Sequence, residues 1–267
     1  MILTADPPMT QAAPKAGTLI DPITRPPRIL ISLATYNERD NLAPLIHEIQ
    51  SYLPGAHIFV IDDNSPDGTG NLADELAASD HRIRVLHRPG KLGLGTALMA
   101  AMTYAEENGY DYLQNMDADC SHPPRFLPGI IAGMDTHDVM IGSRYVPGGG
   151  TENWPFARRV MSRSVNRLVR VLFGMPVRDA SGAFRCYRVS KLQDVRLDKM
   201  RSRGYSFQQE VLFRCHKAGC RLGEFPIIFE NRRYGSSKVN AKEAARSLAM
   251  IFYIGMRNVL GLEPRMV

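Results

Sequence analysis

The chain has 267 residues, of which 44% are hydrophobic and 22% charged, as in soluble globular proteins of one or two domains. This composition excludes a collagen-like, coiled-coil or wholly disordered protein. The net charge of +6 is unevenly divided, with 9 basic and 16 acidic residues (−7) in 1–134 against 24 and 11 (+13) in 135–267. Charge alone favours a solvated basic surface, although the asymmetry also suits an anionic partner.

Short apolar runs alternate with helical periodicity after a proline-rich segment, 1–27, that we expect to be a disordered tail. The pattern predicts strands at 29–33, 57–61, 83–87, 110–116 and 138–142. It predicts helices at 41–52, 69–78, 96–107 and 124–134. Such alternation indicates an α/β fold with a mostly parallel, doubly wound sheet and helices on both faces. We assign 28–240 to this one domain.

The C-terminal segment, 241–267, is expected to contain a helix with one apolar face. Lys242, Arg246 and Arg257 lie at the rim of that face, so the helix either rests in a membrane interface or packs into the core. No run reaches the roughly 18 apolar residues of a membrane span, and no signal peptide is evident. Four cysteines without a CxxC pair argue against a zinc cluster and fit a reducing, cytoplasmic compartment.

Acidic pairs follow two of the predicted strands, Asp62 with Asp63 and Asp117 with Asp119. Ligands of doubly wound sheets bind at the carboxyl ends of the strands. Asp117 and Asp119 are separated by one residue, and alternate residues of an extended segment point the same way. Two such carboxylates could hold Mg²⁺ or Mn²⁺. Because Asp-x-Asp is short and common, an Asx-type turn is the competing interpretation.

Arginine dominates the basic half, with 19 arginines against 5 lysines in 135–267. The planar guanidinium binds phosphate bidentately. A glycine-rich turn at 90–95 matches neither the dinucleotide nor the P-loop fingerprint, and is either a phosphate-approaching turn or simply a tight one. An acidic metal site on one half and arginines on the other predict two phosphorylated substrates.

Eight segments, in order, carry a resemblance to a known family. They are 35–38, 61–69, 91–97, 116–119 with 121–124, 142–145, 179–185, 204–208 and 234–238. The chain resembles the dolichyl/polyprenyl-phosphate mannose synthases, which are family-two glycosyltransferases with the GT-A fold. The resemblance implies inverting transfer of mannose from GDP-mannose to a polyprenyl phosphate by an enzyme that lies peripherally at the cytosolic face of a membrane.

The resemblance also assigns roles to individual positions. It places the nucleotide sugar against Ala34, Tyr36, Glu38, Ile61, Asp63, Asp117, Ala118, Asp119 and Lys238. It gives the metal to Asp117, Asp119 and Ser121, and the lipid phosphate to Arg144, Arg159 and Arg232. Asp119, Arg144 and Arg232 are the expected catalytic residues. The chain departs from the family at Ala34, where many members have proline, and at Ser121, where glutamine is frequent.

The arginine content favours a phosphate acceptor over a hydroxyl. The second pKa of a phosphate monoester is about 6, so its oxygen is largely anionic at neutral pH and needs no strong general base. A hydroxyl acceptor would instead require a carboxylate base. The alternatives are UDP-glucose as donor, a saccharide hydroxyl as acceptor, and a non-catalytic protein that binds anionic lipid.

Nucleic acid is not an expected partner, because the chain has one tryptophan, no aromatic-basic motif and an acidic half. The expected partners are GDP-mannose or another nucleotide sugar, polyprenyl phosphate, a membrane surface and, as a further candidate, a membrane-tethering subunit. His122 and the other six histidines show no metal-ligand spacing, and we interpret them as core or surface residues.

Overall fold

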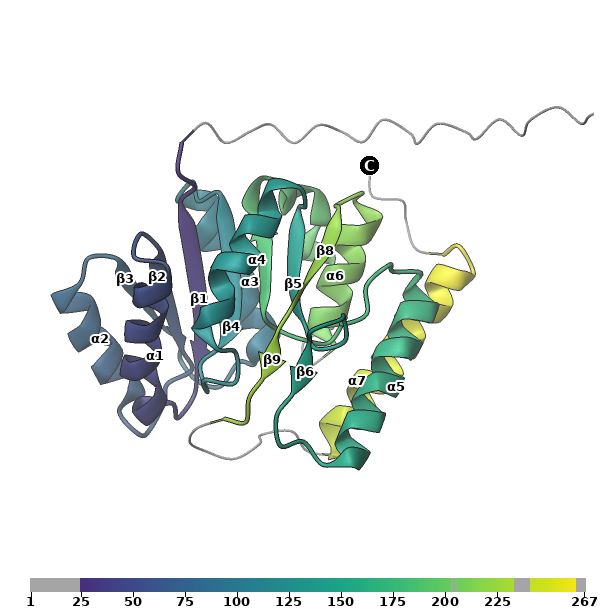
Figure 1. The fold of residues 1–267 in the computed structure, drawn as a ribbon, viewed down its shortest axis with the longest axis horizontal. Helices are drawn as coiled ribbons and strands as arrows, with labels where there is room; N and C mark the ends of the chain where they lie inside the picture. The colour runs from purple at the N-terminus through teal and green to yellow at the C-terminus, as the bar shows by residue number, and fades with distance from the viewer. Residues whose placement is uncertain (1–24, 203, 205, 233–240, 263–267) are drawn as a thin grey trace, which may run out of the picture.

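A computed structural model describes residues 25–202, 204, 206–232 and 241–262. One seven-stranded sheet forms the centre of the molecule, in the order β3-β2-β1-β4-β7-β5-β8, and helices cover both of its faces (Figure 1). Its strands are β1 (Ile29–Thr35), β2 (His57–Asp62), β3 (Ile83–His87), β4 (Tyr112–Asp117), β5 (Val139–Ser143), β7 (Arg185–Arg188) and β8 (Leu222–Pro226). A separate pair joins β6 (Gly150–Thr151) to β9 (Ile228–Phe229).

The helices are α1 (Arg39–Tyr52), α2 (Thr69–Ser79), α3 (Leu94–Glu107), α4 (Leu127–Ala132), α5 (Phe156–Phe173), α6 (Phe207–Lys217) and α7 (Ala241–Val259). The helix predicted at 124–134 is instead three short pieces, since 3₁₀ turns at Pro124–Phe126 and Gly133–Asp135 flank α4. Pro128 lies in the first turn of α4, where a residue without an amide hydrogen is tolerated but cannot extend a preceding helix.

The central strands are buried on both faces, which is why the sequence shows them as continuous apolar runs. Along β1, Leu30 contributes to one hydrophobic cluster, whereas Ile29, Ile31 and Leu33 contribute to another. The expected α/β fold with a mostly parallel sheet is confirmed. Strands β1, β2 and β4 run parallel, so their carboxyl ends meet at one edge of the sheet.

Strand β7 was not predicted and runs antiparallel to both β4 and β5. Its sequence begins and ends with arginine, yet Arg185 is fully buried and donates to the carbonyls of Gln208 and Ala180. Arg188 similarly donates to the carbonyl of Met134. The strand is therefore hidden from an apolar pattern because a buried arginine that donates to backbone oxygens stands at each of its ends.

Helices α5 and α7 lie side by side at one end of the molecule (Figure 1). Ile251 and Ile254 of α7 are buried in the core, and Asn258 donates to the carbonyl of Leu172 on α5. Much of the outer surface of α7 stays apolar, since Phe252, Leu248 and Met256 among others are exposed. Within the part of the chain that the structure describes, no helix is long and apolar enough to cross a bilayer.

Candidate active site

The predicted nucleotide-sugar residues converge on the carboxyl ends of β1, β2 and β4. Ala34 on β1 lies opposite Ile61 on β2 and opposite Asp117 on β4. Just beyond β1, the Lys91 ammonium lies 4.6 Å from the centre of the Tyr36 ring. The glycine-rich turn that carries Lys91 thus reaches the same edge of the sheet.

Asp63 holds the glycine-rich turn in place. Its carboxylate forms an ion pair with Arg88, which in turn donates to the hydroxyl of Thr96 at 2.7 Å and to the carbonyl of Gly93 at 3.2 Å. Gly93 has φ 93°, a conformation that glycine adopts without steric cost, and α3 begins at the next residue. Of the two interpretations of the glycine-rich segment, a tight turn is sufficient to explain Gly93.

Three further predicted contacts are largely covered by protein. Glu38 is 9% exposed, and its carboxylate accepts a hydrogen bond from the Asn41 amide at 2.8 Å. The side chains of Ile61 and Ala118 are buried in the hydrophobic clusters. A nucleotide at this edge would meet these two residues through their backbone.

A turn, rather than an extended segment, brings Asp117 and Asp119 together. Strand β4 ends at Asp117, and Cys120 has φ 64°. The Ser121 amide donates to Oδ1 of Asp119 at 3.1 Å, which is the Asx-type turn weighed against a metal site. The prediction that these two carboxylates point the same way along an extended segment was therefore wrong, because the strand ends at Asp117. The turn uses Oδ1 of Asp119 and leaves Oδ2 facing Arg232 at 3.4 Å.

The electrostatics of Asp117 and Asp119 suit the binding of a cation. Removal from bulk water and the neighbouring Asp119 carboxylate raise the pKa of Asp117 above its ordinary value, although a third of its side-chain surface is exposed. Two carboxylates this close repel each other unless a cation lies between them.

His122 is buried beneath this turn, as a core residue, which is one of the two roles expected from sequence. Its Nδ1 accepts a hydrogen bond from the Asp117 amide at 3.0 Å, and its ring stacks on Phe184 with centroids 4.9 Å apart. Burial lowers the pKa of His122, so the ring is neutral at pH 7. Its proton then sits on Nε2, which lies 3.9 Å from Oδ2 of Asp117.

The residues at this turn suit a hard divalent cation. The Ser121 hydroxyl is buried and has no hydrogen-bond partner in the described structure, and it lies beside the two carboxylates in sequence. Carboxylate and hydroxyl oxygens are ligands that Mg²⁺ and Mn²⁺ prefer. No cluster of three or more His, Cys, Asp or Glu side chains that could hold a metal occurs among the described residues.

Arg144 is held by a buried carboxylate. Its Nε and Nη2 donate to the two oxygens of Asp179, both at 2.7 Å, and Nη2 also donates to the Ser181 hydroxyl at 2.8 Å. Burial by itself would lower the pKa of Arg144, but the fully buried Asp179 outweighs it and raises the pKa. Arg144 is thus a permanent, oriented cation, and only part of its fork remains for a phosphate.

Arg158, and not the predicted Arg159, is coupled to the other cations of the site. The Arg158 guanidinium lies 3.8 Å from the centre of the Trp154 ring, and Arg144 lies 5.5 Å from it. Partial burial and the positive charges of Arg232 and Arg144 lower the pKa of Arg158. Arg159 is exposed on α5, and its guanidinium has no contact with this group among the described residues. Lys238 lies outside the described residues.

Comparison with known proteins identifies the sequence family. Residues 31–196 match the model of glycosyl transferase family 2. A polyprenol monophosphomannose synthase from Mycolicibacterium smegmatis is 40% identical over 244 residues, which cover 90% of this chain and 92% of that one. An undecaprenyl-phosphate mannosyltransferase from Micrococcus luteus is 41% identical over 213 residues, covering 80% and 88%. The resemblance inferred from the motifs is confirmed.

Solved structures with lower identity share the fold. A glucosyl-3-phosphoglycerate synthase from Mycobacterium tuberculosis, in complex with Mn²⁺, UDP and glucosyl-3-phosphoglycerate, has a TM-score of 0.61 at 16% identity and covers 89% of this chain and 81% of its own. A mannosyltransferase from Pyrobaculum calidifontis, in complex with GDP-Man and Mn²⁺, has a TM-score of 0.59 at 16% identity, covering 88% and 65%. These similarities confirm the GT-A fold.

Proposed function

The chain belongs to glycosyl transferase family 2, and we propose that it transfers mannose from GDP-mannose to a polyprenyl phosphate, with inversion at the anomeric carbon. The observation that carries this proposal is the meeting of an acidic turn with a group of arginines at one edge of the sheet. Arg232 lies 3.4 Å from Asp119, and Arg144 and Arg158 contact the same tryptophan.

The donor would bind along the ends of β1, β2 and β4. Tyr36, Asp63 and the backbone near Ala34 would surround the nucleoside, and Asp117 and Asp119 would face the diphosphate. We assign Asp117, Asp119 and Ser121 to a bound Mg²⁺ or Mn²⁺, supported by the unpartnered Ser121 hydroxyl. When bound, that ion would neutralise charge that develops on the leaving diphosphate.

The acceptor phosphate would be held by Arg158, Arg144 and Arg232. A phosphate oxygen attacks the anomeric carbon of mannose, and the bond from that carbon to the diphosphate breaks, which releases GDP. Because the attacking oxygen is already anionic near pH 7, the chain needs no base to deprotonate it. Its arginines instead overcome the repulsion between two anionic substrates and fix their orientation.

A lipid acceptor requires the enzyme to approach a bilayer, and we propose a peripheral position at the cytosolic face. Exposed apolar side chains on α5 and α7 support this, since Phe156 is 74% exposed and Val259 64% exposed. Apolar helical faces with basic flanks are typical of interfacial helices. Replacing the exposed Phe252 and Val259 with serine should then weaken vesicle binding while leaving GDP binding intact.

Transfer of radiolabel from a panel of nucleotide sugars to polyprenyl phosphate, with and without Mn²⁺, tests the proposal. We expect transfer from GDP-mannose, and a loss of at least about 100-fold in kcat for Asp119→Asn. Asp135→Asn is the matched control, because Asp135 is exposed and its charge acts on Tyr112, at the opposite end of β4 from Asp117. Transfer from UDP-glucose alone would overturn the donor assignment, and no transfer from any donor would favour a binding protein.

A further inference from the structure

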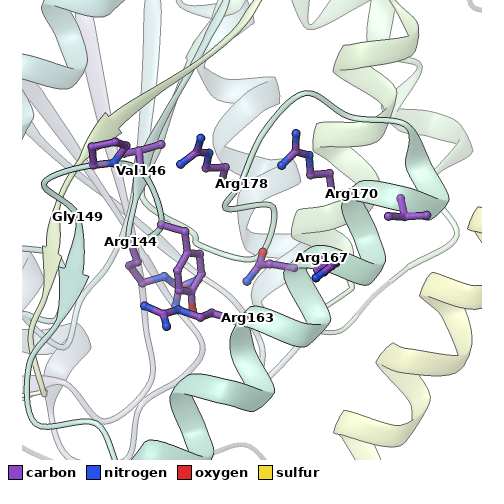
Figure 2. Close-up of a pocket in the computed structure, with 11 residues that line it drawn as sticks. Arg144, Val146, Gly149, Arg163, Arg167, Arg170 and Arg178 are labelled. Atoms are coloured by element: carbon purple, nitrogen blue, oxygen red, sulfur yellow. The ribbon is translucent and has the colours of Figure 1, made fainter.

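A second basic site lies beside the proposed acceptor site. A groove of about 740 Å³ runs between α5 and the loop that follows β5 (Figure 2). Four exposed arginines line it, here called the groove arginines: Arg163, Arg167, Arg170 and Arg178. The first three lie three or four residues apart, a spacing that places them on one face of the helix. The rest of the lining contains no acidic residue.

The groove arginines have no carboxylate partner within the described part of the chain. The nearby Glu224 accepts from the backbone amide of Arg178 at 2.8 Å, and from that of Asp179 at 2.9 Å. Arg163 lies 5.9 Å from the centre of the Tyr145 ring, a neutral contact. Four like charges with no counter-ion repel each other, so an anion bound between them would be stabilised.

This groove is separate from the turn at 117–121 that carries Asp117 and Asp119, here called the metal turn. Arg144 reaches its edge, but the fork of Arg144 closes on Asp179 and its side chain is 8% exposed. The hydroxyl of Tyr145 donates to Ser162 at 2.6 Å, which ties the loop after β5 to α5. Of the two arginines whose charges act on Asp117, Arg144 lines the groove and Arg232 does not, and Arg158 does not line it either.

The surroundings of the groove favour a membrane over a soluble anion. Val171 belongs to its lining and is 70% exposed, and Val160 lies near the same face of α5 at 46% exposed. Guanidinium groups bordered by exposed apolar side chains match the boundary between phospholipid headgroups and acyl chains. A soluble polyphosphate would gain nothing from those apolar side chains.

We propose that the groove arginines bind the phosphate headgroups of acidic phospholipids and so orient the enzyme on the bilayer surface. The groove then takes a bulk anionic lipid, distinct from the polyprenyl phosphate that accepts the sugar. This inference goes beyond the proposed transferase activity, and its test measures binding without turnover, so either can fail alone.

Flotation of the full chain with two kinds of vesicle tests the groove. The probes are phosphatidylcholine vesicles and vesicles of phosphatidylcholine with phosphatidylglycerol at 3:1. The triple variant Arg167→Gln, Arg170→Gln, Arg178→Gln removes three charges from the groove. The control variant Arg84→Gln, Lys199→Gln, Lys217→Gln removes three charges elsewhere on the surface. Circular dichroism checks that both variants fold, and GDP binding is measured in parallel.

We expect the wild type to prefer the acidic vesicles and to lose that preference at 0.5 M salt. The groove variant should bind acidic vesicles on the order of 10- to 100-fold more weakly, since each arginine near an anionic surface contributes severalfold. The control should lose much less, and GDP binding should be unchanged. Equal binding of the wild type to both vesicles would overturn the proposal, as would equal losses in the two variants or a loss of GDP binding in the groove variant alone.

Discussion

The Arg158 guanidinium lies 3.8 Å from the centre of the Trp154 ring, and Arg144 lies 5.5 Å from the same ring. Trp154 is 7% exposed and packs edge-on against Phe229, with ring centroids 5.3 Å apart. Its indole Nε1 is buried without a hydrogen-bond partner in the described structure. One aromatic ring thus lies near two cations that would otherwise repel each other, and its N–H group is a second feature that this ring contributes.

Substitution of Trp154 separates these two contributions. Trp154→Phe keeps an aromatic face but removes the N–H donor, whereas Trp154→Leu removes both. If cation–π attraction positions Arg158, we expect Trp154→Leu to raise KM for polyprenyl phosphate about tenfold, and Trp154→Phe to raise it less. KM for GDP-mannose should change little in both. Equal effects of the two variants would assign the role to the N–H group instead.

Adjacent arginines on α5 provide a matched pair. Arg158→Ala should lower kcat/KM for the lipid acceptor by at least about tenfold, because a charge-assisted phosphate contact contributes about 1.5–3 kcal/mol. Arg159→Ala removes the same charge from the next position of the same helix and should reduce the rate less than threefold. Steady-state transfer assays at varied acceptor concentration distinguish the two. A larger effect of Arg159→Ala would restore the assignment made from sequence.

The parallel part of the fold was predictable because its strands are buried on both faces and its helices keep an apolar stripe. That pattern fails where charged side chains are buried, as at Arg185, whose guanidinium donates to two backbone carbonyls. The metal turn was recognised from Asp117 and Asp119, but its Asx geometry depends on a positive φ at Cys120 that residue types do not specify. The residue types thus predicted a metal site, but they did not predict the backbone conformation that forms it.

Pairings distant in sequence were not predictable from spacing. Arg144 and Asp179 are 35 residues apart, and only the sheet brings them together. The choice between Arg158 and Arg159 depends on the rotation of α5, which the packing against α7 fixes. A weak signal did exist for Trp154, since it is the single tryptophan and immediately precedes an arginine-rich helix. His122 likewise follows the acidic turn directly in sequence.

His122 is expected to position Asp117 through the backbone. Replacing His122 with phenylalanine leaves the Asp117 amide without its acceptor, a loss of about 1–3 kcal/mol for a buried donor. We expect the Mn²⁺ concentration for half-maximal activity to rise about tenfold. His122→Asn restores an acceptor and should recover part of the affinity. Loss of folding stability without a change in metal requirement would reduce His122 to a packing role.

The Arg144–Asp179 pair predicts how stability depends on pH. Burial by itself would raise the pKa of Asp179, but Arg144 outweighs it and lowers the pKa. A carboxylate whose pKa is lower in the folded chain stabilises it above the unfolded value of about 3.9, and this contribution disappears as pH falls through the folded value. Asp179→Asn should therefore reduce the free energy of unfolding at pH 7 by about 3–5 kcal/mol, because it leaves Arg144 buried without its counter-charge.

Urea unfolding of wild type and Asp179→Asn at pH values from 7 down to 3 measures this linkage. The difference in unfolding free energy should stay constant between pH 7 and 5 and shrink below about pH 4, as the carboxylate of the unfolded wild-type chain begins to take up a proton. Asp74→Asn is the control, because Asp74 pairs with His87 at the surface and should change stability by less than about 1 kcal/mol. A difference that persists undiminished to pH 3 would contradict this linkage, because the unfolded carboxylate takes up its proton near pH 3.9 however low the pKa of Asp179 lies in the folded chain. The loss of stability in Asp179→Asn would then arise from packing and not from the ion pair with Arg144.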